Sequence, residues 1–312
     1  MEGLVISNTG SRYVVLTDGD DGGELLCAAK GNLRIRGIRT TNPVAVGDRV
    51  RVSPGRDIAY ITEIMPRRNY IIRRASNLSK ESHILASNID SVLLVASLAH
   101  PVTSTTFIDR FLATAEAYSV PAILVLNKAD LLTDPDEKEL LDAVAYLYRS
   151  IGYKVVVTST VSGEGMDDLR AAVADKITLL SGNSGVGKSS IINALVPDAN
   201  VLTAELSDSH DTGMHTTTFS RMYQLPQGGR LIDTPGVKGF GTIDFDRHEV
   251  AHFFPEIFRA GCDCRFGDCT HPTEPGCAVR QALEQNLIAA SRYASYLSIL
   301  EDDATTSASK YR

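Results

Sequence analysis

Residues 182–189, GNSGVGKS, have the types and spacing that bind phosphate, because they fit the pattern GxxxxGK[ST]. Glycines let the backbone wrap around phosphates, so that successive N–H groups and a helix N-terminus point at negative charge. Lys188 would reach the β and γ phosphates, and the Ser189 hydroxyl would ligate Mg²⁺. A plain glycine-rich turn is disfavoured, because an expected strand precedes the pattern and an expected helix follows it. The predicted nucleotide contacts here are Gly182, Asn183, Ser184, Gly185, Val186, Gly187, Lys188, Ser189 and Ser190.

A second signature, Asp233-Thr-Pro-Gly236, also follows an expected strand. The Asp233 carboxylate can hold Mg²⁺ through water, and the Gly236 amide can contact a γ-phosphate. Alone this segment could be an ordinary turn, but its pairing with a phosphate loop favours a nucleotide site.

A third signature, Asn127-Lys-Ala-Asp130, follows the apolar segment AILVL and selects guanine. Guanine presents N1–H and N2–H donors side by side, and the Asp130 carboxylate can accept both. Adenine would leave that carboxylate unpaired, which argues against an ATPase. Lys128 would lay its stem over the base, and Asn127 would join this loop to the phosphate loop. Ser159 and Thr160 could offer a backbone N–H to the guanine O6.

The order of these motifs predicts a circularly permuted GTPase domain. Guanine-binding domains of the common type run from the phosphate loop through DxxG to NKxD, whereas here NKxD at 127 precedes the phosphate loop at 182. Strand neighbours can survive such a change because the termini of these domains often lie close together. One consequence is that the segment after Gly236 leads directly into a tail rich in cysteine.

That tail contains Cys264, Cys269, His271 and Cys277, which offer three thiolates and one imidazole. Four such ligands form a closed tetrahedral site of the kind that structural zinc occupies. Cys262 could replace Cys264, and ordinary reduced thiols are the alternative. The fifth cysteine, Cys27, is isolated and is expected to be a small buried side chain.

The elements that must position these groups form an N-terminal barrel and a following region of alternating strands and helices. An N-terminal barrel of the oligonucleotide-binding type is predicted by short segments rich in Val and Ile, and residues 67–79 are interpreted as a linker. From about residue 84, strands alternate with helices, which requires a parallel sheet covered on both faces. The polar loop 197–215 is unusually long, and loops of this length in compact domains are usually functional or disordered. The five barrel strands are expected at 2–7, 10–17, 24–28, 47–52 and 58–64.

Charge is distributed unevenly along the 312 residues, which carry a net charge of −7. Residues 1–75 hold 12 Lys and Arg against 8 Asp and Glu, a balance of +4, and the rest of the chain has a balance of −11. A basic segment on an acidic chain favours a polyanion such as RNA as the binding partner, with a solvated arginine-rich surface as the alternative.

No apolar stretch approaches the length of a membrane helix, and the start of the sequence lacks a secretory signal, so we expect a cytoplasmic protein without membrane contact.

The permuted motif order, the phrase Gly213-Met-His215-Thr-Thr-Thr218 and the tail CRFGDCTHPTEPGCAVRQAL together resemble the RsgA/YjeQ family of circularly permuted GTPases. The resemblance covers essentially the whole chain and matches the family zinc pattern at all four ligand positions. It implies a GTPase that acts late in maturation of the small ribosomal subunit and is stimulated by that subunit. We expect the protein to be a monomer. The resemblance also implies three domains: a barrel (1–75), a permuted α/β P-loop GTPase domain (76–245) and a helical zinc-binding domain (246–312).

The resemblance gives His215 a catalytic role. Val237 stands where many GTPases carry the glutamine that positions water, so slow intrinsic hydrolysis is expected and His215 would orient the attacking water. Thr217, or failing that Thr216, would supply the second Mg²⁺-ligating hydroxyl. GTP would favour binding to the subunit, and hydrolysis to GDP would release the protein. Arginines of the barrel would contact rRNA phosphates: Arg34, Arg36, Arg39, Arg67 and Arg68.

Two other functions are compatible with these motifs. One is a nucleotide-gated RNA-binding assembly module in which hydrolysis is incidental. The other is a permuted GTPase of the large subunit, against which the zinc tail and the barrel argue.

Overall fold

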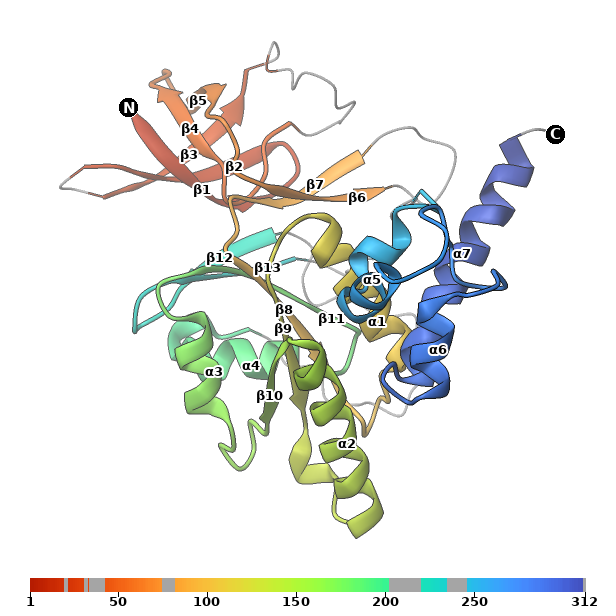
Figure 1. The fold of residues 1–312 in the computed structure, drawn as a ribbon. Coiled ribbons are helices and arrows are strands. Elements are labelled where there is room, and N and C mark those ends of the chain that lie inside the picture. The colour runs from red at the N-terminus through yellow and green to blue at the C-terminus, as the bar shows by residue number, and fades with distance from the viewer. Residues whose placement is uncertain are drawn as a thin grey trace.

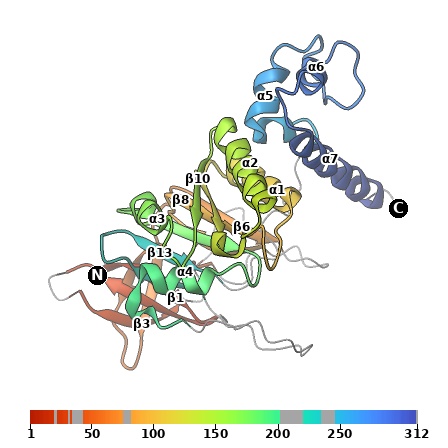
Figure 2. The same ribbon diagram turned by 90° about the horizontal axis from the view of Figure 1, so that it is seen from below.

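The computed structural model describes residues 1–19, 22–30, 33, 43–74, 82–201, 220–234 and 246–310. It shows a barrel of N-terminal strands, a central sheet with helices on both faces, and a group of C-terminal helices (Figure 1). The barrel and the C-terminal helices lie on different sides of the central sheet (Figures 1 and 2). Every helix in these described ranges is too short or too polar to cross a membrane.

The N-terminal barrel has five strands, as the sequence predicts, and it closes because β1 pairs with both β2 and β4. Its interior is filled by alternate apolar side chains, among which Val5, Tyr13 and Ile61 are buried. Cys27 is also fully buried there, as expected. The strands are β1 (Glu2–Asn8), β2 (Arg12–Thr17), β3 (Glu24–Ala29), β4 (Arg49–Ser53) and β5 (Ala59–Ile64).

A two-stranded hairpin connects the barrel to the central sheet. The strands β6 (Tyr70–Arg74) and β7 (Ser82–Ser87) pair antiparallel. The interpretation of residues 67–79 as a linker is therefore wrong for 70–74, where basic side chains on a strand give the sequence the polarity of a loop.

Five strands of the central sheet are parallel and run in the order β10-β9-β8-β11-β13, with β12 added antiparallel at one edge. This is the parallel sheet that the alternating pattern predicts, and every residue of β8 is buried. The strands are β8 (Ser91–Ala96), β9 (Ala122–Asn127), β10 (Lys154–Thr158), β11 (Ile177–Gly182), β12 (Ser220–Gln224) and β13 (Arg230–Asp233).

Helices cover both faces of this sheet, so two apolar clusters fill its two sides. Phe111 and Leu141 belong to one cluster, and Leu169 and Ile191 belong to the other. The first cluster lies under α1 (Thr105–Ala117) and α2 (Pro135–Ile151), and the second lies under α3 (Met166–Val173) and α4 (Lys188–Leu195).

The barrel and the central sheet form one continuous eleven-stranded sheet, because β1 pairs with β12. In this pairing Ser7 lies opposite Arg221 and Asn8 lies opposite Ser220. The register of β1 against β2 shifts between Val5 and Ser7. The first half of β1 therefore closes the barrel, and its second half joins the neighbouring domain.

A buried ion pair holds the junction between barrel and hairpin. Arg67 donates from Nε and Nη2 to the two carboxylate oxygens of Asp48, both at 2.6 Å, and its side chain is only 8% exposed. Ser87 on β7 donates its hydroxyl to Asp48 Oδ1 at 2.6 Å. Because the partners come from the barrel and from the hairpin, the pair fixes one against the other.

A second buried network, centred on Arg292, attaches the C-terminal helices to the central domain. The side chain of Arg292 is 1% exposed and donates to Asp109 Oδ1 at 2.9 Å and to Glu256 Oε1 at 2.6 Å. The Tyr148 hydroxyl donates to the same Asp109 oxygen, and the Arg292 guanidinium lies 4.5 Å from the centre of the Phe254 ring. The helices joined here are α1, α2, α5 (Pro255–Gly261) and α7 (Ala290–Lys310), and α6 (Ala278–Glu284) completes the group.

Arg292→Met should therefore destabilise the protein strongly. Removing the guanidinium leaves the Asp109 and Glu256 carboxylates buried without a cation, which costs about 3–5 kcal/mol. The free energy of unfolding, measured by urea denaturation, should fall by this amount. Arg280→Met, at an exposed position of α6, is the matched control, and equal losses in the two variants would show that the network contributes little.

Candidate functional site

The phosphate loop lies between β11 and α4, and its three glycines have backbone angles that favour glycine. Gly182, Gly185 and Gly187 have φ values of 146°, 81° and 97°. A Cβ at Gly182 would lie 2.3 Å from the Val95 carbonyl oxygen, and one at Gly187 would lie 2.3 Å from Asn127 Nδ2. Only residues without a side chain fit these two positions.

Lys188 is the first residue of α4, and its ammonium donates to the carbonyl oxygens of Gly182 at 2.8 Å and Asn183 at 2.5 Å. The ammonium is therefore held over the loop that is expected to bind phosphate. Burial lowers the pKa of Lys188 below its usual value, and the Asp233 carboxylate partly opposes this shift. Ser189 and Ser190 follow in the first turn of α4.

Asp233 ends β13, next to the phosphate loop, because β13 pairs with β11 so that Asp233 lies beside Leu180. Its side chain is buried, and the neighbouring Thr234 has a buried hydroxyl without a hydrogen-bond partner. This arrangement brings two of the predicted motifs to the same edge of the sheet.

The base-recognition motif is joined to the phosphate loop by Asn127. The Asn127 amide donates from Nδ2 to the Val186 carbonyl oxygen at 2.9 Å, and its Oδ1 accepts from the Thr158 hydroxyl at 3.0 Å. Lys128 has a φ of 66°, and its ammonium donates to the His100 carbonyl oxygen at 2.5 Å. The base loop and the phosphate loop are therefore held at a fixed separation.

Asp130 is oriented by the side chain of Ser159, a residue for which the sequence predicts only a backbone contact. The Ser159 hydroxyl donates to Asp130 Oδ1 at 2.5 Å and accepts from the backbone N–H groups of Val161 and Ser162. These bonds fix the position of the hydroxyl, so the carboxylate that would read guanine is held before the ligand arrives. Thr160 follows in the same loop and is half-buried. A serine directly after a strand, one strand away from NKxD, is the signal that could have predicted this contact.

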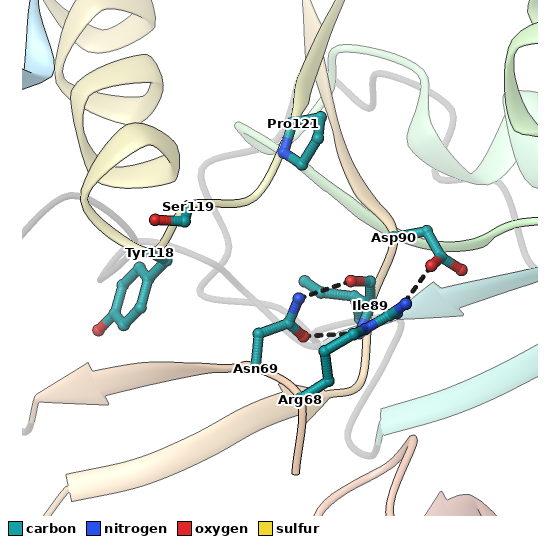
Figure 3. Close-up of a pocket in the computed structure, with 7 residues that line it drawn as sticks. All are labelled: Arg68, Asn69, Ile89, Asp90, Tyr118, Ser119 and Pro121. Atoms are coloured by element: carbon teal, nitrogen blue, oxygen red, sulfur yellow. Dashed lines mark hydrogen bonds and ion pairs between the residues drawn. The ribbon is translucent and has the colours of Figure 1, made fainter.

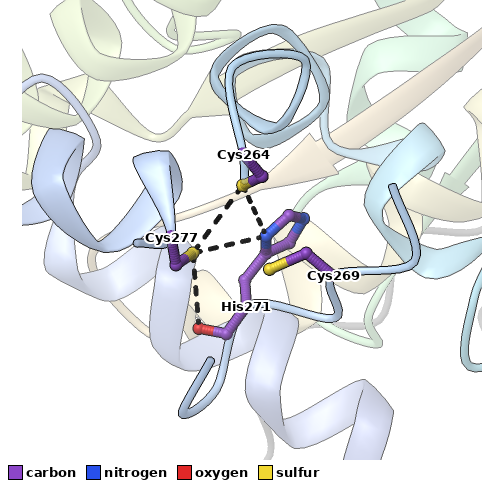
Figure 4. Close-up of side chains that lie close together, drawn as sticks. All are labelled: Cys264, Cys269, His271 and Cys277. Carbon is purple, nitrogen blue, oxygen red and sulfur yellow. Dashed lines mark hydrogen bonds between the residues drawn. The ribbon is translucent and has the colours of Figure 1, made fainter. Parts of the chain in front are cut away.

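The four expected metal ligands lie together in the C-terminal region (Figure 4). His271 Nδ1 is 3.6 Å from Cys264 Sγ and 3.5 Å from Cys277 Sγ, and the two sulfurs are 3.9 Å apart. Ideal tetrahedral zinc, with Zn–S near ~2.3 Å and Zn–N near ~2.05 Å, would separate two sulfurs by roughly 3.8 Å and sulfur from nitrogen by roughly 3.6 Å. Cys264, Cys277 and His271 therefore have the separations that a zinc site needs, and with Cys269 they form a set of four ligand atoms that all lie within 4.8 Å of one another.

Hydrogen bonds around the cluster fix the loop that carries His271. The Tyr293 hydroxyl on α7 donates to the His271 carbonyl oxygen at 2.9 Å, and Glu274 accepts from both the N–H and the hydroxyl of Thr270. Cys262 lies outside the cluster, since its thiol is exposed and donates to the Phe258 carbonyl oxygen. The geometry thus favours Cys264 over Cys262 as the ligand.

Several predicted residues lie outside the described part of the chain, and their roles stay predictions. They are His215, Thr216, Thr217, Gly236 and Val237 at the nucleotide site and Arg34, Arg36 and Arg39 in the barrel.

Of the two predicted RNA-contacting arginines that the structure describes, Arg67 is wrongly assigned, because it is buried against Asp48. Charge counting cannot distinguish an arginine that forms a buried pair from one that faces solvent. Arg68 is 60% exposed and contacts Asp90 at 2.7 Å. Arg68 also lines a cavity of about 310 Å³ (Figure 3), but that cavity lies at the amino end of β8, away from the nucleotide motifs.

Comparison with known proteins gives consistent matches. A sequence model of the RsgA GTPase family matches residues 64–243. The chain is 58% identical over 318 residues to the small ribosomal subunit biogenesis GTPase RsgA of Porphyromonas gingivalis, covering 100% of this chain and 99% of that protein. It is 56% identical over 303 residues to the protein of the same name from Bacteroides fragilis, covering 97% of each.

Two solved structures are similar along nearly the whole chain. The crystal structure of YjeQ from Thermotoga maritima has a TM-score of 0.76 and 31% identity, covering 97% of this chain and 98% of that one. The structure of YloQ, described as a circularly permuted GTPase, has a TM-score of 0.71 and 30% identity, covering 98% of this chain and 95% of that one.

Asp130→Asn should exchange the base preference of the site. An amide at this position offers a donor where guanine N2–H needs an acceptor, and it suits the additional carbonyl oxygen of xanthine. GDP affinity should fall on the order of 10²–10⁴-fold while XDP affinity rises. Titration with fluorescent GDP and XDP measures this, with Asp136→Asn in the exposed first turn of α2 as the control. Retention of the GDP preference by Asp130→Asn would show that another group selects the base.

Proposed function

The chain belongs to the RsgA GTPase family, and on that premise we propose that it hydrolyses GTP as a timer in the maturation of the small ribosomal subunit. It binds the subunit and its rRNA with GTP, the subunit stimulates hydrolysis, and the GDP form leaves. The observation that best supports the nucleotide part is the bond from Asn127 to Val186, which joins the base loop to the phosphate loop. We assign the barrel to residues 1–75, the GTPase domain to 76–245 and the zinc-binding domain to 246–312.

Binding and orientation of GTP are assigned to the groups at the carboxyl edge of the sheet. Asp130, oriented by Ser159, accepts hydrogen bonds from the guanine N1–H and N2–H donors. The Lys188 ammonium exchanges its bonds to the loop carbonyl oxygens for bonds to the β and γ phosphates. Ser189 and Thr217 would hold a Mg²⁺ ion, which offsets the negative charge that develops during phosphoryl transfer. Asp233, on the strand beside the phosphate loop, would fix a water of that ion.

Hydrolysis is assigned to water oriented by His215. The apolar side chain of Val237 cannot position water, so the isolated protein should be slow. We propose that contact with the small subunit brings His215 and Thr217 into position for hydrolysis, as partner proteins do for other GTPases.

Contact with rRNA is assigned to the exposed surface of the barrel. With Arg67 buried, the described candidates are Arg68 and the exposed cations Arg12, Lys30 and Arg56. Phosphate contacts release counterions, so binding should weaken as salt increases. We propose that the protein acts in the cytoplasm as a monomer.

Small ribosomal subunits should accelerate GTP hydrolysis by this protein on the order of 10²-fold, within the range that a positioned proton-transfer or water-orienting group supplies. His215→Ala should remove most of that acceleration, whereas His248→Ala, at an exposed described position, should retain it. Phosphate release with and without purified subunits measures both. An unchanged stimulated rate in His215→Ala would exclude its assigned role, and no stimulation of the wild type would exclude the subunit as activator.

The same preparation tests whether GTP hydrolysis releases the protein from the subunit. Protein loaded with a non-hydrolysable GTP analogue should stay with subunits through a sucrose gradient, while protein loaded with GTP should leave. Equal release in the two cases would favour a nucleotide-gated RNA-binding module in which hydrolysis is incidental.

Zinc is assigned to Cys264, Cys269, His271 and Cys277. The purified protein should contain about one zinc per chain, since four ligands close a structural site. Cys277→Ser should lose the metal, and Cys262→Ser should keep it because Cys262 lies outside the cluster. Elemental analysis of the three proteins measures this. A folded wild type without metal would contradict the assignment. Loss of zinc in Cys262→Ser would show that Cys262, and not Cys264, is the ligand.

A further inference from the structure

We propose that the loop between β8 and α1, residues 97–103, is an additional element of the guanine-nucleotide site that positions Lys128 and the phosphate loop. No sequence motif marks this loop. The inference rests on the proposed nucleotide site and adds to it the residues that hold two of its parts in place.

The topology of the sheet brings this loop to the site. In the strand order β9-β8-β11, the base motif follows β9 and the phosphate loop follows β11. Ala96, the last residue of β8, lies beside Leu126, and Val95 lies beside Gly182. A chain that leaves β8 at its carboxyl end must therefore pass between the base loop and the phosphate loop.

The loop contacts both of them. The His100 carbonyl oxygen accepts from the Lys128 ammonium at 2.5 Å. On the other side, a Cβ at Gly185 would lie 3.2 Å from Cδ and 3.4 Å from Cγ of Pro101, so the proline ring lies directly against the phosphate loop. Burial lowers the pKa of Lys128, and Asp130 partly opposes that shift.

Buried hydrogen bonds hold the loop in this shape. The Thr103 N–H donates to the Ser97 carbonyl oxygen at 2.7 Å, and the Ser97 N–H donates to the Thr103 hydroxyl oxygen at 3.1 Å. The Ser97 hydroxyl accepts from the Ala99 N–H at 3.2 Å. Both Ser97 and Thr103 are fully buried, and Ser104 then caps α1 by accepting from Phe107 N–H. The loop is thus closed at its base while its tip contacts the site.

The consequence for the ligand follows from the geometry of a lysine side chain. An ammonium bonded to the His100 carbonyl oxygen limits the positions open to the Lys128 stem, so the stem is already placed when the face of the base arrives. A loop that loosens would free both the Lys128 stem and the adjacent phosphate loop. Bound guanine nucleotide should then dissociate faster, with the guanine preference set by Asp130 unchanged.

Thr103→Val tests this, because valine keeps the shape of threonine and leaves the Ser97 N–H without its acceptor. The dissociation rate of fluorescent GDP should rise about tenfold, as expected for loss of one hydrogen bond to a buried group. Thr103→Ser keeps the hydroxyl and should retain the wild-type rate, and Thr106→Val, at an exposed position of α1, should have no effect.

Two further measurements separate positioning from simple destabilisation. The difference in melting temperature with and without GDP should shrink in Thr103→Val, whereas a purely structural role would lower both temperatures equally. Combined with Lys128→Met, Thr103→Val should raise the dissociation rate by a smaller factor than it does alone, since part of its effect acts through the Lys128 side chain. Pro101→Ala, paired with Val102→Ala as an exposed neighbour, should accelerate dissociation without changing the buried hydroxyls.

Wild-type dissociation rates in both Thr103→Val and Pro101→Ala would overturn the role of the loop. Failure of the wild-type protein to bind GDP would instead overturn the nucleotide site itself.

Discussion

The alignment of parallel strand ends at one edge of the central sheet is the constraint on which the rest of the molecule depends. Backbone hydrogen bonds set Leu180 beside Asp233 and Thr158 beside Asn127, so loops that are distant in sequence emerge together. The chemistry needs only this spatial order. A sequence that enters the sheet at a different strand therefore builds the same site, which explains how NKxD can precede the phosphate loop without loss of geometry.

Motifs with a defined spacing were predictable from the sequence, as were the barrel, the parallel sheet and the Cys₃His cluster. These features depend on residue type and on local periodicity. Features set by tertiary contacts were not predictable. The arginines of β6 make its sequence look like a polar loop, so the strand could not be predicted. The burial of Arg67 depends on Asp48, which lies 19 positions away. The loop after β8 acts through a carbonyl oxygen and a proline ring, neither of which has a sequence signature. The roles of His215 and Thr217 remain predictions.

Two buried arginines show how the three regions are held together. Arg67 fixes the barrel to the hairpin, and Arg292 fixes the C-terminal helices to α1 and α2. A buried ion pair adds little net stability relative to apolar packing, but it tolerates few geometries because each charge must meet its partner. We infer that these pairs specify how the regions are oriented. Since α7 also bonds to the loop of His271, the Cys₃His cluster and the central domain are both attached to the same helix.

The pairing of β1 with β12 has a consequence for the domain boundary. An open sheet ends in a row of unpaired N–H and C=O groups, and such an edge is a template for aggregation. In this chain β12 would be that edge, and β1 covers its first residues. The barrel is therefore a protective cap for its neighbour as well as a candidate RNA-binding surface. A GTPase domain separated from its barrel would also expose the beginning of the β12 edge, which β1 covers in the whole protein.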